Sequence, residues 1–244
     1  MGTRKMEPSS SLNDIVYFVK DGDVNEELVY SIRSVVENFP HRKIWIYGGK
    51  PKAINTVNHI PFKQSGETKW DKVKGMFASV CLNPNITEDF FLFNDDFFVI
   101  NKVDEYTTYC RCSLPEHIIA VEQAYNDAPT QYTKQLRKTY YRLTELGMPT
   151  LSYELHIPIL FNKFKLLQTI GAFSDYHCTR SLYGNYFDLG GVQHADVKVY
   201  DKSKQNFDEN FYYLSTDDNA WIKDVVGVKS FIQKKFPNKS EYEL

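Results

Sequence analysis

Residues 14–51 read DIVYFVKDGDVNEELVYSIRSVVENFPHRKIWIYGGKP and contain the signals of a strand, a helix and a second strand. The apolar run at 14–19 is closed by Asp-Gly-Asp, which predicts a buried strand that ends in a turn. Apolar residues then recur at helical spacing as far as a proline, and Asn25 is a suitable N-cap for that helix. A second apolar run, at 42–51, ends in glycine and proline. This order is that of a βαβ unit, so the sequence predicts a parallel sheet covered by helices.

The alternation of strands and helices continues beyond this unit. The sequence predicts a short strand at 56–60, an amphipathic helix at 69–83 and a further strand that begins at Asp89. The predicted fold class is therefore α/β, with an open sheet and polar residues at the carboxyl ends of its strands. Ligands of such sheets bind in the crevice outside those ends.

The rest of the chain reads as helices and irregular segments added to this sheet. We expect two helices, a strand or loop that leads into a third helix, an irregular stretch rich in polar residues, and a closing strand and helix. The corresponding ranges are 115–128, 130–147, 149–171, 175–191 and 211–237. The simplest organisation is a disordered leader at 1–12 and one domain at 13–244, with a helical insertion at about 113–148.

The composition is typical of a globular protein. Of the 244 residues, 42% are hydrophobic and 25% are charged, and the formal net charge is −2. No apolar run is long enough to span a membrane, and the start of the chain lacks the apolar segment of a signal peptide. The net charge argues against a protein coated with phosphate-binding cations, although it leaves room for a local basic groove.

Cysteine usage and aromatic content add two weaker indications. The four cysteines show no CxxC pair and no zinc spacing, which favours reduced thiols in a cytoplasmic protein. The aromatic residues, 15% of the chain, suit either the binding of sugar rings or a core rich in Tyr and Phe.

The segment FFLFNDDFFVI, residues 90–100, places an amide and two carboxylates inside a hydrophobic run. A buried charge without a partner is costly, so either the run ends at a turn into water or a positive group lies there. Adjacent side chains of an extended segment point in opposite directions, so one carboxylate can face a divalent cation while the other orients a loop. Mg²⁺ and Mn²⁺ prefer such oxygen ligands and share them with a diphosphate. The alternative is a turn capped by Asp95 and Asp96 without any ligand.

Other candidate residues each have two interpretations. His156 is either a proton-transfer group or a satisfied core residue, and Arg180 is either a phosphate clamp or a solvated loop residue. Arg33 either points toward the sheet edge or lies on the helix surface. Asp217 and Asp218 form either a second acidic site or the N-cap of the last helix, and we favour the cap. The sequence contains no P-loop, dinucleotide-binding, zinc-protease or serine-hydrolase motif.

Five segments, in order along the chain, resemble the motifs of the Stealth family, the sugar-phosphate transferases of capsule synthesis and lysosomal-enzyme tagging. They are DIVYFVKDG (14–22), NEELVYSIRSVVENFPHRKIWIYGGKP (25–51), FFLFNDDFFVI (90–100), ELHIPILFNK (154–163) and FPNKSEYE (236–243). The resemblance implies a GT-A-like open mixed sheet with a Rossmann-like N-terminal half and a helical insertion. Lys20 departs from the pattern, because FVKDG stands where the family has TWVDG or TWVNG. The departures leave open whether a sugar or a sugar phosphate is transferred.

The resemblance also implies roles for particular residues. Asp95 and Asp96 would hold Mn²⁺ or Mg²⁺. The catalytic residues would be His156, Asp96 and Arg180, with Arg180 as a phosphate clamp. The residues that would bind the nucleotide sugar are Tyr17, Val19, Asp21, Arg33 and Asn94.

We therefore expect a metal-dependent transferase that moves a sugar from a nucleotide-sugar donor to a glycan, a lipid-linked precursor or a modified nucleic-acid base. One alternative is a Stealth-type sugar-1-phosphate transferase, and the other is a non-catalytic carbohydrate-binding module. The lysines at 63, 69, 72 and 74 form either a small basic strip for a nucleic acid or a solvated helix face.

Overall fold

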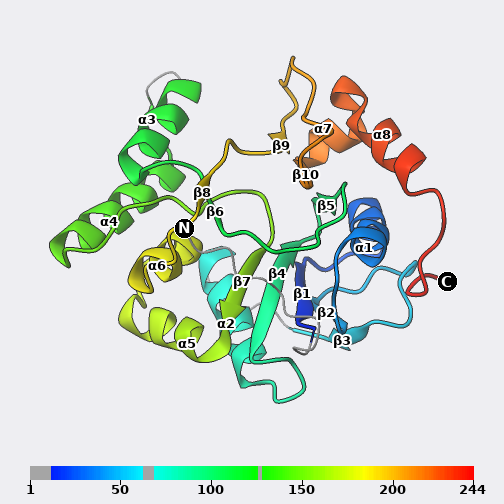
Figure 1. The fold of residues 1–244 in the computed structure, drawn as a ribbon, viewed down its shortest axis with the longest axis horizontal. Coiled ribbons are helices and arrows are strands. Elements are labelled where there is room, and N and C mark those ends of the chain that lie inside the picture. Colours follow the sequence, from blue (N-terminus) through cyan, green and yellow to red (C-terminus); the bar gives the residue numbers. More distant parts are fainter. Residues whose placement is uncertain (1–11, 63–68, 126–127) are drawn as a thin grey trace. The chain divides into compact units, whose positions relative to one another are not determined.

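The computed structural model describes residues 12–62, 69–125 and 128–244 (Figure 1). The chain divides into two compact units. One unit consists of Thr107–Leu155 and Asn162–Asp196. The other, the sheet unit, consists of the described part of Lys5–Tyr106 together with His156–Phe161 and Val197–Leu244. The helical stretch that we expected at 113–148 lies in the first unit, and the leader expected at 1–12 lies outside the described residues except for Leu12.

A five-stranded, mostly parallel open sheet confirms the predicted α/β class. Its strand order is β3-β2-β1-β4-β7. The chain passes from β1 outward to β2 and β3, then returns to the other side of β1 as β4, so the strand order reverses between β1 and β4. The strands are β1 (Asp14–Val19), β2 (Ile44–Gly48), β3 (Asn58–Ile60), β4 (Asp89–Asn94) and β7 (Ile159–Asn162).

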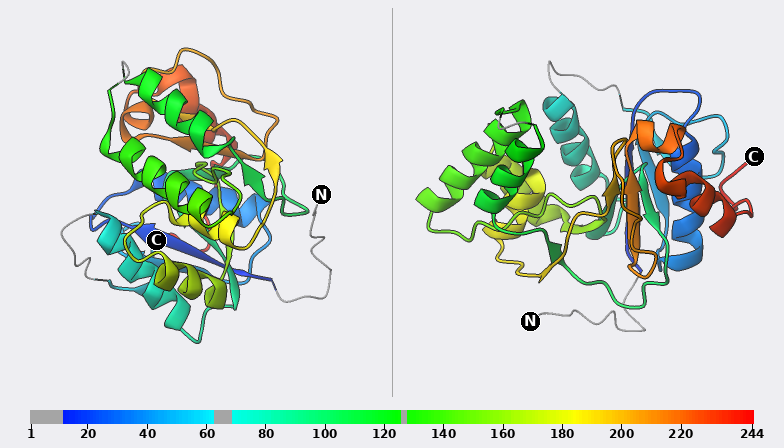
Figure 2. Two further views of the ribbon diagram at one scale, coloured as in Figure 1. Left: turned by 90° about the vertical axis from the view of Figure 1, so that its left-hand side faces the viewer. Right: turned by 90° about the horizontal axis from the view of Figure 1, so that it is seen from above.

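Helices cover both faces of this sheet, as the continuous apolar strands require. Figure 2 shows α1 (Glu26–Asn38) and α2 (Lys69–Leu82) on opposite faces. The Asn25 side chain accepts a hydrogen bond from the backbone of Leu28, at 2.9 Å, which confirms it as the N-cap of α1. Helix α1 ends at Asn38, just before the Phe-Pro pair.

A second, three-stranded sheet lies beside α1 in the same unit. Its order is β5-β10-β9, with β5 (Phe97–Val99) antiparallel to β10 (Tyr213–Thr216) and β9 (Lys198–Val199) parallel to β10. The hydrophobic run at 90–100 is thus divided between two sheets, because it turns at Asp95 and Asp96. Both halves are buried.

Polar side chains of α1 satisfy the backbone of β5. The Ser31 hydroxyl donates to the carbonyl of Phe97, the Ser34 hydroxyl accepts from the Val99 N–H at 2.9 Å, and the Asn38 amide donates to the Val99 carbonyl at 2.8 Å. Because β5 is an edge strand, these bonds replace those of a missing neighbour. They fix α1 against the segment that follows Asp96.

The closing helix expected near the C-terminus is interrupted. The segment contains α7 (Asp218–Ile222), a short 3₁₀ turn (Val225–Gly227) and α8 (Val228–Lys235). The break is located where Asp224, Val226 and Gly227 adopt left-handed backbone angles, with φ of 51°, 49° and 72°. Asp217 caps α7 by accepting from the Ala220 N–H at 2.7 Å, which confirms the N-cap interpretation.

The first unit contains the helices predicted for 115–128 and 130–147 and a two-stranded sheet. Both helices begin with a capping box, at Ser113 and Thr130, which explains why the sequence signals were clear. The elements are β6 (Tyr109–Cys110), α3 (Leu114–Ala124), α4 (Gln131–Glu145), α5 (Lys163–Ala172), α6 (Thr179–Tyr186) and β8 (Val192–Gln193).

Helix α6 corrects the irregular stretch predicted for 175–191. Its N-cap, Cys178, makes no side-chain capping bond, so the local helix signal is weak. Tertiary contacts stabilise α6 instead: the Asn185 amide donates to the Leu151 carbonyl at 2.7 Å, and the Tyr153 ring lies against Gly184, where a Cβ would come within 2.3 Å of the ring. Such packing supplies most of the stability of short helices.

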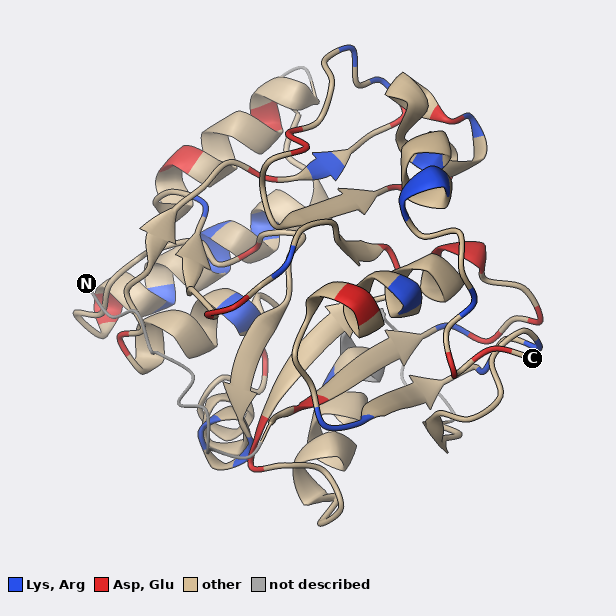
Figure 3. Cartoon of the chain, turned by 45° about the vertical axis from the view of Figure 1, so that its right-hand side comes forward, with Lys and Arg blue, Asp and Glu red and all other residues tan. Residues whose placement is uncertain are grey.

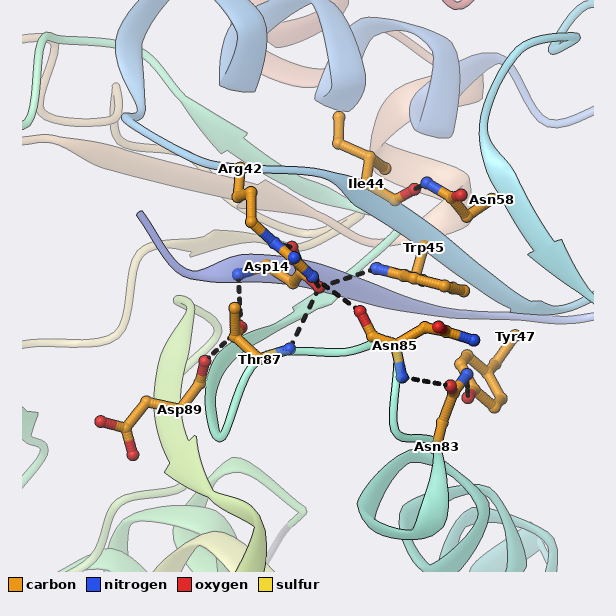
Figure 4. Close-up of polar contacts among 10 residues, drawn as sticks. All are labelled: Asp14, Arg42, Ile44, Trp45, Tyr47, Asn58, Asn83, Asn85, Thr87 and Asp89. Atoms are coloured by element: carbon orange, nitrogen blue, oxygen red, sulfur yellow. Dashed lines mark hydrogen bonds and ion pairs between the residues drawn. The ribbon is translucent and has the colours of Figure 1, made fainter. Parts of the chain in front are cut away.

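The amino ends of three strands are joined by a buried carboxylate (Figure 4). Asp14 is fully buried and accepts two hydrogen bonds from Arg42, at 2.8 and 2.7 Å, and one from the Trp45 indole at 2.9 Å. The Thr87 N–H, just before β4, also donates to Asp14 at 3.2 Å. This network lies at the edge of the sheet opposite to the candidate site.

Two further expectations concern the chain as a whole. No helix among the described residues is long and apolar enough to cross a membrane. None of the four cysteines forms a disulfide.

Candidate functional site

The carboxyl ends of β1 and β4 lie side by side where the strand order reverses. Phe18 pairs with Asn94, and the turn at Asp95 and Asp96 follows at once. The Asn25 side chain, at the start of α1, donates a 2.6 Å hydrogen bond to Oδ2 of Asp95 and so connects the segments that follow both strands. A crevice at this point of an open sheet is where ligands bind.

Asp96 is paired with a cation. Oδ2 of Asp96 accepts from the Lys198 ammonium at 2.8 Å and from the Ser215 hydroxyl at 3.2 Å. Lys198 and Ser215 stand opposite each other in the β9-β10 pair, so the small sheet presents both to the same oxygen. The run therefore turns at Asp95 and Asp96, and the ammonium of Lys198 lies beside Asp96.

Glu27 adds a third carboxylate from the first turn of α1, which is coloured red in Figure 3. Its carboxylate accepts from the Thr216 hydroxyl, next to Ser215 on β10. Burial raises the pKa of Glu27 to about 7, the Thr216 bond opposes the rise, and the charges of Asp96 and Asp95 add to it. The pKa of Asp95 is also raised, by burial and by Asp96, against the lowering effect of Asn25. The cluster thus keeps an excess of negative charge despite Lys198.

His156 lies beside this cluster in the same unit. Its half-buried ring stands edge-on to Phe97, which follows Asp96, and to Tyr200, which follows β9, with a distance of 6.4 Å between ring centroids in each case. The structure thereby brings His156, Asp95 and Asp96 into one region.

Of the expected donor-binding residues near β1, two belong to the core. Tyr17 is fully buried, and its hydroxyl is 2.9 Å from that of Ser31. Burial raises the pKa of Tyr17, and the nearby Asp95 charge adds to the rise. Val19 is 1% exposed. A ligand therefore has no access to either side chain, whereas Asp21 is exposed in the bend after β1.

Arg33 is engaged elsewhere in the sheet unit. Its guanidinium donates two hydrogen bonds to Glu243, at 2.8 and 2.7 Å, and a third to the Phe236 carbonyl at 3.0 Å. It lies eight residues along α1 from Asn25, a rise of about 12 Å. Because its guanidinium donates to the C-terminal segment, we leave Arg33 out of the candidate site.

The remaining expected residues fall outside the sheet unit or outside the described side chains. Arg180 belongs to α6 of the first unit, where it donates to the Leu155 carbonyl at 2.8 Å. Its role as a phosphate clamp stays a prediction. Of the four lysines in the basic strip, only Lys74 has a described side chain.

The donor atoms can be compared with the needs of a divalent cation. Among the residues that the structure describes, no three His, Cys, Asp or Glu side chains form a group that could hold a metal ion. Mg²⁺, however, is commonly bound through one or two carboxylates and substrate phosphates. The contacts of Asn25, Lys198 and Ser215 all use Oδ2 atoms of the two aspartates. Two carboxylates are the kind of oxygen ligand that such a cation takes, provided that the phosphates of a substrate complete the set.

Sequence reasoning missed Glu27 and Lys198 as members of the cluster. Glu27 had a usable signal, because the first turn of a helix after β1 begins at the same sheet edge as Asp95. Lys198 had none, since it is 102 residues from Asp96 in the chain. Comparison with protein-family models and with curated proteins finds no match to this sequence.

Proposed function

We propose that the chain is a metal-dependent transferase with a GT-A-like fold that moves a sugar from a nucleotide-sugar donor to an acceptor hydroxyl or base. The observation that supports this most is the group of carboxylates at the point where the strand order reverses. That position is the usual ligand crevice of open α/β sheets, and an excess of negative charge there attracts a cation. Disulfide-free cysteines agree with a cytoplasmic location.

The chain's own residues have distinct parts in this proposal. Asp95 and Asp96 would hold Mn²⁺ or Mg²⁺, and a cation bound there would supply positive charge to offset the charge that develops on the leaving diphosphate. Asn25 orients Asp95, and Ser215 orients Asp96. His156 takes the proton of the acceptor hydroxyl. The acceptor oxygen forms a bond to the sugar carbon while the bond from that carbon to the diphosphate breaks, and the products are a glycosylated acceptor and a nucleoside diphosphate.

The Stealth-like segments support a second chemistry at the same site. In sugar-1-phosphate transfer the bond between the two phosphates breaks, and the acceptor gains a phosphodiester. The released nucleotide is then a monophosphate. Identification of that nucleotide separates the two chemistries.

The test is a thermal-shift screen with UDP-, GDP- and CMP-linked sugars, with and without Mn²⁺, followed by turnover assays of the sugars that bind. A ligand of the folded state raises the melting temperature. Asp95→Asn should lower metal-dependent binding by more than the ~10- to 100-fold typical of losing a residue that only supports a metal ligand. Asp104→Asn, an exposed carboxylate of the same unit, is the matched control and should match the wild type.

Two results would count against the proposal. If no nucleotide sugar binds the wild type with or without metal, the transferase proposal fails. If nucleotide sugars or glycans bind without turnover, and His156→Ala binds as the wild type does, the chain is a non-catalytic carbohydrate-binding module.

A further inference from the structure

Among the described residues, Lys198 is the cation in direct contact with the carboxylate cluster. It forms an ion pair with Asp96 in which the two side chains are 15% and 14% exposed. The neighbouring bond from Ser215 to the same oxygen fixes the position of the Asp96 carboxylate. Lys198 is thus held at a defined place beside the proposed donor site.

The hydrogen-bonding capacity of this ammonium is only partly used. A lysine ammonium has three N–H donors and no acceptor. One donor is directed at Asp96, and the described part of the chain supplies no further acceptor to Lys198. Two donors therefore remain for water or for the oxygens of a bound anion, and a partly buried ammonium gains most from an anion.

The charge of the cluster makes a cation necessary if an anion is to bind there. Glu27 lies near the carboxylates of Asp96, Asp95 and Asp218: burial is the main cause of its raised pKa, and the negative charges of these three residues add to the rise. A diphosphate would be repelled by these carboxylates. A divalent cation offsets part of the repulsion, and an ammonium beside Asp96 offsets more.

We propose that Lys198 is a phosphate-binding residue of the donor site, which keeps its bond to Asp96 and donates its remaining N–H groups to oxygens of a nucleoside diphosphate. This inference rests on the proposed transferase function. It differs from a purely structural ion pair, which would join β9 to the turn at Asp95 and Asp96 and contact no ligand.

Lys198→Met distinguishes the two roles, because it should shift two affinities in opposite directions. Loss of a charge-assisted bond should weaken UDP or GDP binding at saturating Mg²⁺ about 10- to 100-fold. Loss of a positive charge next to Asp96 should strengthen the binding of Mn²⁺ alone about tenfold. Calorimetry measures the first affinity, and electron paramagnetic resonance of free Mn²⁺ measures the second.

Two variants serve as controls. Lys198→Arg should keep nucleotide affinity within about threefold, and Lys102→Met, which removes an exposed ion pair, should change neither the nucleotide affinity nor the Mn²⁺ affinity.

Each outcome decides the matter. Unchanged nucleotide affinity in Lys198→Met overturns the inference and leaves the proposed function standing. Weakening of both affinities also overturns it, since that pattern reports a structural ion pair. A wild type that binds neither UDP nor GDP overturns the inference together with the function. If Lys198→Met does not fold, Lys198→Gln replaces it, because the amide can still donate to Asp96 while the charge is absent.

Discussion

At the scale of single residues, Glu27 shows how a fold imposes a cost on one carboxyl group. Its side chain is partly removed from water and faces Asp95 and Asp96, so the charged form is disfavoured and its pKa rises to about 7. The Thr216 hydroxyl offsets only part of this effect. A cation bound near Glu27 would stabilise the charged form of its carboxyl group, which the free protein disfavours.

The raised pKa predicts a specific pH dependence of stability. Because the folded state holds the Glu27 proton more tightly than the unfolded state, Glu27 opposes folding increasingly as the pH rises from about 4.5 to about 7. Glu27→Gln removes this effect and keeps an acceptor for Thr216. Relative to the wild type, the unfolding free energy of the variant should rise by roughly 2.5 kcal/mol between pH 5 and pH 8, which is an upper estimate because it converts the whole pKa difference into stability.

Urea unfolding at the two pH values measures this difference. Glu37→Gln, an exposed carboxylate on the same helix, is the matched control. A stability difference between Glu27→Gln and the wild type that is the same at both pH values would contradict the prediction.

At the scale of elements, the loops after β1 and β2 pack backbone against backbone at the edge that carries the site. The N–H of Gly49 donates to the Val19 carbonyl at 3.1 Å. A Cβ at Gly49 would lie 2.3 Å from the Lys20 carbonyl oxygen and 2.7 Å from Cα of Asp21. Only glycine permits this approach, so the second glycine of the Gly-Gly pair helps to set the path of the loop after β1.

Gly49→Ala should therefore displace that loop. We expect a loss of about 1–3 kcal/mol in unfolding free energy, the usual cost of overpacking, and weaker nucleotide binding. Gly22→Ala, in the same loop, is the control, because its Cβ would meet nothing closer than 3.9 Å and should change stability by less than about 0.5 kcal/mol. Equal stability of the two variants in urea unfolding would show that the loops do not pack as described.

The elements also show what the sequence can and cannot predict. The βαβ unit and helices α3 and α4 carry local signals, such as the cap at Asn25 and the boxes at Ser113 and Thr130. No local signal predicts that β5 belongs to a second sheet, because its position depends on hydrogen bonds with Ser31 and Ser34, which are more than sixty residues away in the chain. The candidate site divides in the same way. Asp95 and Asp96 stand out as charges in an apolar run, whereas Lys198 looks like any surface lysine until the fold brings it to Asp96.

At the scale of the whole molecule, the C-terminal segment returns to α1 within the sheet unit. Arg33 and Glu243 form a nearly buried ion pair, with side chains 11% and 5% exposed, and the Ser240 N–H donates to the same carboxylate at 2.8 Å. Beside this ion pair, the Asn55 N–H donates to the Tyr242 carbonyl and the Leu244 N–H donates to the Ala53 carbonyl. Two of the five Stealth-like segments therefore meet in this contact. The contact between these two segments stabilises the fold, and this structural role accounts for Arg33 and Glu243 without any ligand.

This contact separates a structural role of Arg33 from the donor-binding role that the resemblance implies. Arg33→Met leaves Glu243 buried without its cation, which should lower the unfolding free energy by roughly 3 kcal/mol. Adding Glu243→Gln should recover part of that loss, because the coupling between two residues in contact is about 0.5–3 kcal/mol. In a double-mutant cycle followed by urea unfolding, a coupling near zero would show that the pair does not fasten the C-terminal segment.

Nucleotide affinity, measured where every variant is folded, should stay at the wild-type value, since Arg33 is engaged with Glu243 and the Phe236 carbonyl. A large loss of nucleotide affinity in Arg33→Met with little loss of stability would instead return Arg33 to the donor site and would require the C-terminal segment to release it when the nucleotide binds.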